Sequence, residues 1–301
     1  LNPEKIDDSA LESMPSFTAL TSLNLAPDEL LELDGQQLSF ELMDAVTLRA
    51  IYSKRRLFER MVEFWNDHFN IDIDRGECDN LKTVDDRDVI RASALGRFED
   101  LLISSATSPC MLHYLDTDTS TLAAPNENYA RELMELHTIS PGNYTQQDVH
   151  EIARCFTGWM WWVRGSGWAG GMFRYRPDLH DDGEKVLLGH TIPAGGGLND
   201  GFTVLRILAE HPATADHIAL KLCRWLLEDN PSPTVVRSVS SVFTQTGGDI
   251  KAMIREALRP NHLADARPKF KRPFHLMASV FRALPHTMDS PLPLRYRLGL
   301  T

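Results

Sequence analysis

The chain has 301 residues, of which 43% are hydrophobic and 24% charged, an ordinary composition for a globular protein with a sizeable core. Its formal net charge of −11 argues against a general affinity for nucleic acid or anionic membranes, because binding phosphates needs clustered Lys and Arg. No apolar run approaches the roughly 18 residues of a membrane span, and no signal-peptide pattern opens the sequence. Since the chain begins with Leu1 in place of Met, we expect a processed or truncated form whose compartment the residues do not reveal.

The common motifs of catalysis and metal binding are missing from the sequence. It contains no GxSxG nucleophile elbow and no P-loop, which disfavours esterase and NTPase functions. It also lacks HExxH, and no Glu-x-x-His pair falls on a predicted helix, so no metal site is predicted and any cofactor stays unknown. Four cysteines form no CxxC pair, and either two disulfides or four free thiols fit them: Cys78, Cys110, Cys155 and Cys223.

In chain order, we expect an irregular N-terminal segment over residues 1–37, one helical domain over 38–284 and a C-terminal tail over 285–301. Proline residues keep the helices of the first segment short. In the helical domain, apolar residues recur at helical spacing, and Ser-Pro and Thr-x-x-Asp strings open several helices. Helices are expected at 39–53, 56–69, 89–104, 108–115, 125–140 and 145–157, and later near 201–210, from 211, from 232, at 250–258 and at 270–284.

Two stretches depart from this helical pattern. The charged segment 72–88 contains Gly76 and is predicted to be a loop. The segments 173–175 and 185–188 are predicted to form the two strands of a small β-hairpin, joined through the turn residues at 181–183. The sequence therefore predicts an all-α fold, a single domain of about ten helices with one small β-hairpin insertion.

One predicted helix, PNENYARELMELHTIS, concentrates polar side chains that could carry chemistry. It places an apolar arc opposite a polar arc that holds Glu127, Arg131, Glu132 and Glu135. Paired carboxylates can act as acid and base, so Glu132 and Glu135 are predicted to be catalytic, with Glu127 and Arg131 as substrate-binding residues. The alternative is a solvated helix face whose charges form i,i+4 ion pairs.

A polar loop and a group of tryptophans are the other candidates. We expect His180 and Asp181 to assist catalysis and Lys185 to bind substrate, with a plain polar turn as the alternative. Three closely spaced tryptophans are predicted to stack on sugar rings, with packing in the core as the alternative: Trp159, Trp161 and Trp162. Two histidines among apolar residues, His68 and His137, are instead expected to be hydrogen-bonded core residues.

Several uncommon strings recur in an order that resembles one bacterial family. They include FWNDHF at 64–69, NENYARELMELH at 126–137, HD at 180–181 and HPATA at 211–215. On these strings, and over residues 40–284, the chain resembles the family catalogued as domain of unknown function 1800. The resemblance implies a helical bacterial protein that is periplasmic or secreted and is encoded beside a family resembling sulfatases. It implies no known active site.

Two functions therefore compete at this point. The first is a hydrolase that acts on a polymeric carbohydrate through carboxylate acid/base chemistry. The second is a non-catalytic binding or assembly partner of a sulfatase-like protein, in which the tryptophans would form a protein interface. A polysaccharide ligand belongs to the first function and a protein complex to the second, and neither needs nucleic acid or a membrane span.

Overall fold

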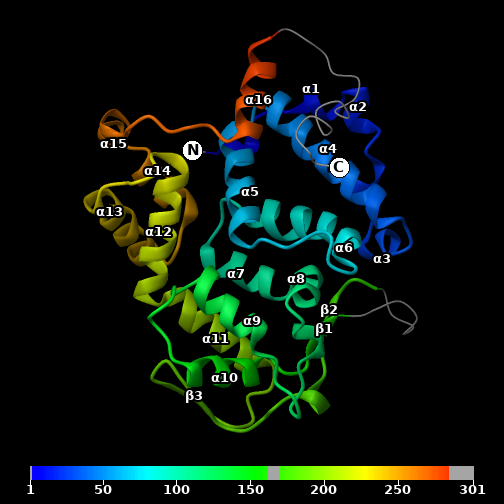
Figure 1. Ribbon diagram of the computed structural model, residues 1–301, viewed down its shortest axis with the longest axis vertical. Helices are drawn as coiled ribbons and strands as arrows, with labels where there is room; N and C mark the ends of the chain where they lie inside the picture. Colours follow the sequence, from blue (N-terminus) through cyan, green and yellow to red (C-terminus); the bar gives the residue numbers. More distant parts are fainter. Residues whose placement is uncertain (1, 162–169, 285–301) are drawn as a thin grey trace.

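Helices make up 64% of the structure, which confirms the all-α prediction. The computed structural model describes residues 2–161 and 170–284, and this part of the chain holds sixteen α-helices, more than the ten or so expected (Figure 1). They are α1 (Ser9–Glu12), α2 (Pro15–Thr18), α3 (Pro27–Leu30), α4 (Gly35–Tyr52), α5 (Arg56–His68), α6 (Cys78–Val84), α7 (Phe98–Ala106), α8 (Pro109–Tyr114), α9 (Glu127–Glu132), α10 (Gln146–Cys155), α11 (Leu198–Glu210), α12 (Pro212–Leu226), α13 (Pro233–Thr246), α14 (Ile250–Ala257), α15 (Pro260–Asp265) and α16 (Pro273–Ala283).

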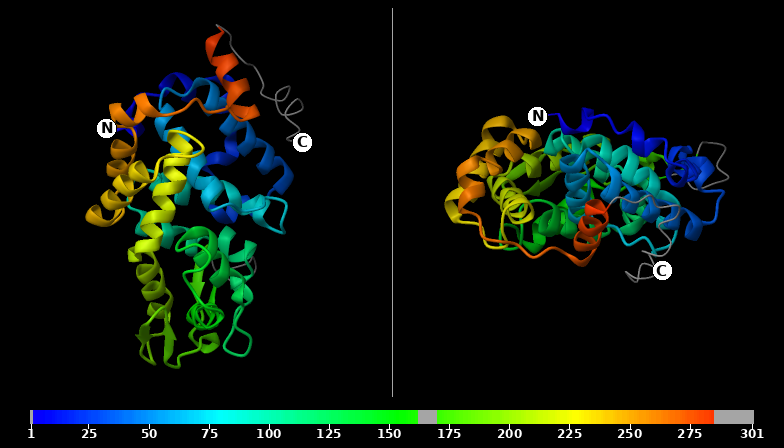
Figure 2. Two further views of the ribbon diagram at one scale, coloured as in Figure 1. Left: turned by 60° about the vertical axis from the view of Figure 1, so that its left-hand side comes forward. Right: turned by 90° about the horizontal axis from the view of Figure 1, so that it is seen from above.

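The helices are arranged along one long axis. Helices α1 to α6 and α16 lie at one end, while α7 to α11 and the strands lie at the other (Figures 1 and 2). Helices α12, α13 and α14 pack on one another along one side. Two π-helical segments, η3 (Asp85–Arg91) and η5 (Leu133–His137), continue α6 and α9, so that α9 and η5 together form one central helix. None of the helices in the described ranges combines the length and apolar character needed to cross a bilayer.

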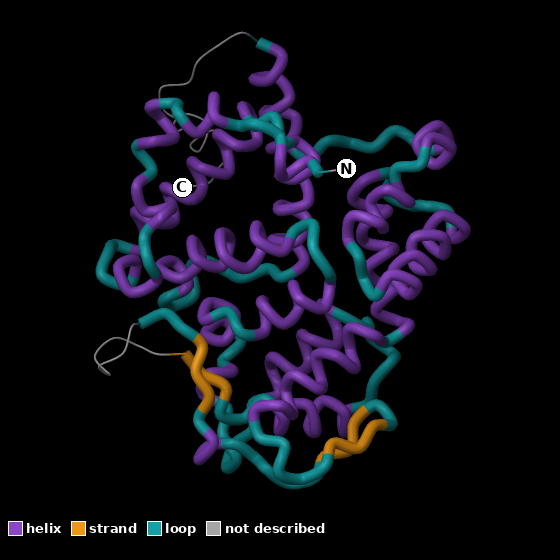
Figure 3. Tube along the Cα trace, turned by 180° about the vertical axis from the view of Figure 1, so that it is seen from behind, coloured by secondary structure: helices purple, strands orange, loops and turns teal. Residues whose placement is uncertain are grey.

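The strands form two short antiparallel hairpins, which corrects the single hairpin expected from the sequence (Figure 3). Strand β1 (Trp159–Trp161) pairs with β2 (Phe173–Tyr175), and β3 (Lys185–Leu187) pairs with β4 (His190–Ile192). Between β3 and β4, Leu188 and the glycine after it have φ values of 47° and 77°, the two positive angles of a tight hairpin turn. The strands predicted to pair across residues 181–183 therefore belong to different hairpins: β2 pairs with β1, and β3 pairs with β4.

The segment 72–88, predicted as a loop, contains helix α6 and the start of η3. Three of its charged residues are buried in the protein: Lys82, Asp85 and Asp86. Lys82 Nζ lies 2.6 Å from a carboxylate oxygen of Asp85, whose other oxygen accepts a 2.7 Å hydrogen bond from Ser108. Charge alone therefore misled the prediction, because a buried ion pair and an exposed charge look the same in sequence.

The central helix lies within the main core, and its predicted apolar arc is largely buried. Tyr129 and Leu133 are 3% and 0% exposed, but Leu136 is 50% exposed. The exception follows from the π-helical turn, which holds more residues than an α-helical turn and rotates Leu136 outward. The hydroxyl of Thr138 donates to the Leu133 carbonyl at 2.6 Å and closes this wide turn. All four cysteines are buried free thiols.

We predict that Gly201→Ala destabilises the protein, although alanine usually favours a helix. A Cβ atom at Gly201 of α11 would lie 2.4 Å from the ring of Trp159, which is buried and backed by Phe156. We expect a loss of about 1–3 kcal/mol in the free energy of unfolding, measured by urea denaturation. Ser241→Ala, at an exposed position of α13, is the control and should leave stability nearly unchanged; a stabilising Gly201→Ala would contradict the packing.

Candidate functional site: a lysine–histidine cluster

Four basic side chains from three helical segments meet at the C-terminal end of the central helix. His68 ends α5, His137 ends η5, and His217 and Lys221 lie one turn apart on α12. Lys221 Nζ lies 2.7 Å from His68 Nδ1, and the ring of His68 is centred 5.9 Å from that of His137 and 6.1 Å from that of His217. We call these four residues the lysine–histidine cluster.

Aromatic packing encloses the inner side of the cluster. The ring of Phe69 is centred 4.6 Å from His68 and 5.0 Å from His137. These two histidines are buried, whereas Lys221 and His217 are only partly buried. We call the buried pair, His68 and His137, the floor of the cluster. The partly buried pair, His217 and Lys221, is its rim.

The hydrogen bonds of His68 assign its tautomer. Its Nε2 lies 3.1 Å from the backbone carbonyl oxygen of His137, which can only accept, so Nε2 carries the hydrogen. Nδ1 is then an acceptor, and it receives a hydrogen from Lys221 Nζ at 2.7 Å. The imidazole of His68 is thus neutral and holds the amine in place.

Ser140 joins the rim through an uncommon backbone conformation. Its φ of 68° is left-handed, which ends the helix, and its N–H donates to the Met134 carbonyl at 2.9 Å. The Ser140 hydroxyl lies 2.5 Å from His217 Nδ1, while His217 Nε2 lies 3.1 Å from the Leu136 carbonyl. By the same reasoning His217 Nε2 carries the hydrogen, and Nδ1 accepts the serine proton.

Burial sets the charge of the cluster. Desolvation, followed by the charge of Lys221, lowers the pKa of each of the three histidines, and that of His137 to about 3. Burial also lowers the pKa of Lys221 to about 8. No carboxylate among the described residues forms an ion pair with Lys221; Asp67, which raises its pKa slightly, is paired with Arg272 at 2.6 Å.

Such a cluster can exchange protons near neutral pH. An amine with a pKa of about 8 is present in both forms there, so it can accept a proton from water or a hydroxyl and return it later. The protonated form can also stabilise an oxyanion. Within the described residues, no group of three or more His, Cys, Asp or Glu side chains is arranged to hold a metal ion.

The predicted catalytic carboxylates lie on the outward side of the same central helix. Glu135 accepts a 3.0 Å hydrogen bond from the hydroxyl of Tyr144, and burial, followed by the charge of Glu135, raises the pKa of Glu132. Of the predicted substrate-binding residues, Arg131 donates to Glu127 at 3.3 Å. This contact is the i,i+4 ion pair of the alternative interpretation, and both side chains are partly exposed.

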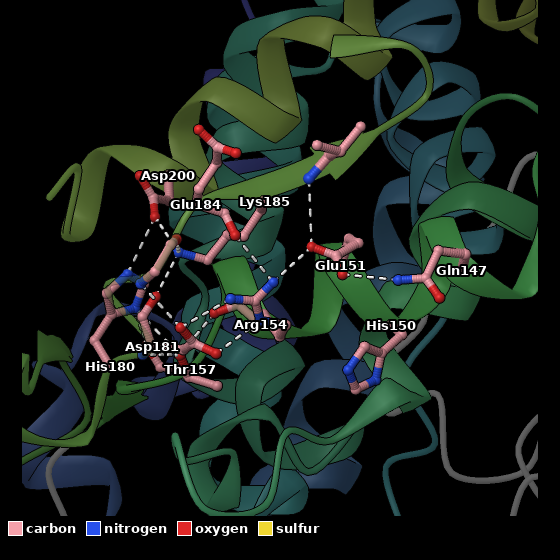
Figure 4. A network of polar contacts seen from close by, with 12 residues as sticks. Gln147, His150, Glu151, Arg154, Thr157, His180, Asp181, Glu184, Lys185 and Asp200 are labelled. Atoms are coloured by element: carbon pink, nitrogen blue, oxygen red, sulfur yellow. Dashed lines mark hydrogen bonds and ion pairs between the residues drawn. The ribbon is translucent and has the colours of Figure 1, made fainter. Parts of the chain in front are cut away.

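The structure does not bring His180 and Lys185 to these carboxylates. They belong to a separate buried network around Asp200 of α11 (Figure 4). Lys185 Nζ lies 2.6 Å from an Asp200 carboxylate oxygen, and His180 Nε2 lies 3.3 Å from the same oxygen. Lys185 is 1% exposed and His180 4%, so neither side chain offers a surface to a substrate, contrary to the roles expected from the sequence.

Asp181 is the outer member of that network. Arg154 donates to its two carboxylate oxygens at 2.7 and 3.1 Å and to Glu151 at 2.7 Å (Figure 4). The Arg154 hydrogen bond is the main cause that lowers the pKa of Asp181 to about 2. A carboxylate held ionised in this way is a poor acid or base near neutral pH, so the network is better explained as the fastening of the 181–197 loop to α10 and α11.

The expected platform of exposed tryptophans does not form from Trp159 and Trp161. They are 0% and 4% exposed, and the Trp161 indole N–H donates to Asp118 at 2.8 Å. Trp159 packs edge-on against Phe156 with ring centroids 4.9 Å apart. Core packing, the alternative interpretation, is confirmed for these two residues, and Trp162 lies outside the described residues.

The sequence analysis missed the rim of the cluster. His217 and Lys221 are four residues apart on α12, which places them on one helix face beside the buried Ile218 and Leu222. This spacing of four residues could have indicated the site, because it places two ionisable side chains on the same helix face, next to the apolar face. His68 is buried and hydrogen-bonded, as expected.

The fold and the cluster together define a helical protein with a buried basic centre. The chain belongs to the family described as protein of unknown function (DUF1800), whose model matches residues 2–299. This confirms the resemblance seen in the sequence and extends it over nearly the whole chain. No curated protein and no solved structure matches the chain.

We predict that Asp200→Asn destabilises the protein strongly. The change removes the charge that compensates the buried ammonium of Lys185, and breaking one half of such a pair costs about 3–5 kcal/mol of unfolding free energy. Urea denaturation at pH 7 measures the loss. Asp178→Asn, which removes an exposed ion pair with Arg176, is the matched control with little expected change. Equal effects of the two variants would contradict a structural role for the buried network.

We predict that His137→Phe flattens the acid side of the stability profile. Because the pKa of His137 is about 3 in the folded protein and near 6.5 when unfolded, unfolding takes up a proton below pH 6.5. Its contribution to stability is therefore complete above pH 6.5 and is lost progressively as the pH falls toward 3. Denaturation at pH 7 and pH 4.5 should show a smaller difference for the variant. His190→Phe, at an exposed site, should keep the wild-type difference; a wild-type slope in His137→Phe would refute the shift.

Proposed function

We propose that this chain is a hydrolase whose acid–base centre is Lys221, positioned by His68 and flanked by His217. The observation that carries the proposal is the contact of Lys221 Nζ with His68 Nδ1 at 2.7 Å, in a place where burial lowers the amine's pKa to about 8. A buried lysine that only stabilised the fold would be expected to have a carboxylate partner. Perturbed pKa values of this kind gather at functional sites.

In this proposal each residue has a separate task. The neutral amine of Lys221 accepts a proton from the attacking water, and the ammonium so formed donates it to the leaving group, which balances the hydrolysis. His68 holds the amine through its Nδ1 acceptor. The Ser140 hydroxyl, oriented by His217, is placed to hydrogen-bond the substrate at the rim. Because the rim is partly exposed and the floor is buried, a substrate would reach the amine from one side.

Carboxylate acid/base chemistry on a polymeric carbohydrate is the second candidate. It is supported by the pKa of Glu132, which burial and then the charge of Glu135 raise, because a carboxyl group with a raised pKa can serve as an acid. Trp159 and Trp161 do not support it, because their rings are buried and would not stack on a sugar. Like the first candidate, it would operate in the periplasm or outside the cell if the chain is exported.

A pH–rate profile separates the two candidates. We expect the full chain to hydrolyse a member of a panel of chromogenic glycosides, esters and soluble polysaccharides, with kcat/KM rising to a plateau through a pKa of about 8. Lys221→Met should lower kcat/KM by about 100-fold or more, whereas Lys54→Met, at an exposed lysine, should not change it.

Other results would reject the Lys221 centre. Highest activity in the acidic range, lost in Glu132→Gln or Glu135→Gln but kept in Lys221→Met, would establish the carboxylate candidate. No hydrolysis of any panel member, together with a stable complex between the chain and the sulfatase-like neighbour, would establish the non-catalytic binding partner.

A further inference from the structure

A cavity of about 620 Å³ lies at the other end of the molecule, between the N-terminal helices and helices α4 and α5. The residues 8–24 form one wall, and Arg49, Glu59 and Arg91 stand on the other. Glu59 lies in the first turn of α5 and His68 ends the helix, about 14 Å further along its axis, so this cavity is separate from the lysine–histidine cluster. The volume suits a small organic molecule.

Most charged groups of the cavity wall are already paired. Arg91 donates to both carboxylate oxygens of Glu59, at 2.7 and 2.9 Å. Asp8 accepts hydrogen bonds from the Ser53 hydroxyl at 2.6 Å and from the Lys54 backbone N–H at 2.7 Å. These contacts satisfy the carboxylates of Glu59 and the buried Asp8, so neither is available to attract a cation.

Arg49 is the exception among the described residues of the wall. Its Nη1 is buried without a hydrogen-bond acceptor, and its ion pair with Asp86 is 3.8 Å long. The guanidinium lies over the ring of Phe17, 5.4 Å from the centroid, and both residues line the cavity. Arginine keeps its charge in proteins, so an acceptor oxygen from outside the chain would complete its hydrogen bonds.

A second unpaired group lies beside it. The hydroxyl of Thr83 is buried without a partner and lines a smaller chamber of about 140 Å³. Arg49 and Phe17 line both chambers, which places the two unpaired groups around one space. The Thr83 hydroxyl and Arg49 Nη1 are thus two buried polar atoms without a partner that belong to one pair of adjoining chambers.

We propose that this cavity binds a small organic molecule with one carboxylate group, whose oxygens pair with Arg49. The body of the ligand would pack on Phe17 and on the exposed edges of Leu11, Leu20 and Leu23, within a lining that is otherwise mostly polar. A single charge suits the site better than a dianionic phosphate, since the walls carry three arginines and three acids: Arg49, Arg55, Arg91, Asp8, Glu12 and Glu59. The carboxylate accepts two hydrogen bonds from the planar guanidinium.

Titration calorimetry of the full chain with octanoate and benzoate tests the proposal. We expect saturable binding of one equivalent at pH 7, and no binding of benzamide, which has the same shape as benzoate without the charge. Arg49→Gln should weaken binding by about tenfold or more. Arg206→Gln, at an exposed arginine of α11, is the matched control and should leave the Kd unchanged.

A second variant guards against loss of folding in Arg49→Gln. Thr21 is exposed at the cavity wall, so Thr21→Phe should fill the entrance without disturbing a buried charge and should abolish binding. Three results would overturn the proposal: no binding of either carboxylate, equal binding of benzamide, or tighter binding of inorganic phosphate. Binding that survives both Arg49→Gln and Thr21→Phe would place the carboxylate elsewhere on the protein and would also overturn it.

Discussion

The partial burial of Lys221 without a carboxylate partner is the constraint on which the rest of this account depends. Two lysines of the described residues are more deeply buried, and each is paired with an aspartate: Lys82 with Asp85 and Lys185 with Asp200, both at 2.6 Å. Lys221 contacts a neutral histidine instead. Removing an ammonium group from water without a counter-charge raises its free energy, so the pKa of Lys221 is lowered. A larger share of the amine is then neutral near pH 7 and can accept a proton.

The surrounding fold fixes this amine in place. Helix α12 supplies Lys221 and His217, and α5 supplies His68. The π-helical end of the central helix supplies His137 and the two backbone carbonyl groups that orient the rings of His68 and His217. A regular α-helix would keep Leu136 on the buried face with Leu133, whereas the π-helical turn leaves it exposed. The π-helical turn therefore contacts both the buried histidines and the partly exposed His217. Such turns are frequent at functional sites.

Much of the fold could be predicted from sequence, because apolar spacing and caps act locally. The capping box at Thr145 and Asp148 opens α10 as expected. The site was harder, because the partners of a polar side chain depend on tertiary contacts. Lys185 was predicted to contact substrate and is buried. No role was predicted for Lys221, which lies within the apolar pattern of α12. Sequence spacing does not say whether a charge meets water, a carboxylate or an imidazole.

The pKa of Lys221 is the quantity that tests this account most directly. Heteronuclear NMR of the lysine Cε and Nζ groups, with the Lys221 resonance assigned by comparison with Lys221→Met, follows its titration without any knowledge of the substrate. The account predicts a midpoint of about 8. A midpoint above about 10, the value of an exposed lysine, would contradict it and would leave Lys221 without a role as an acid–base group.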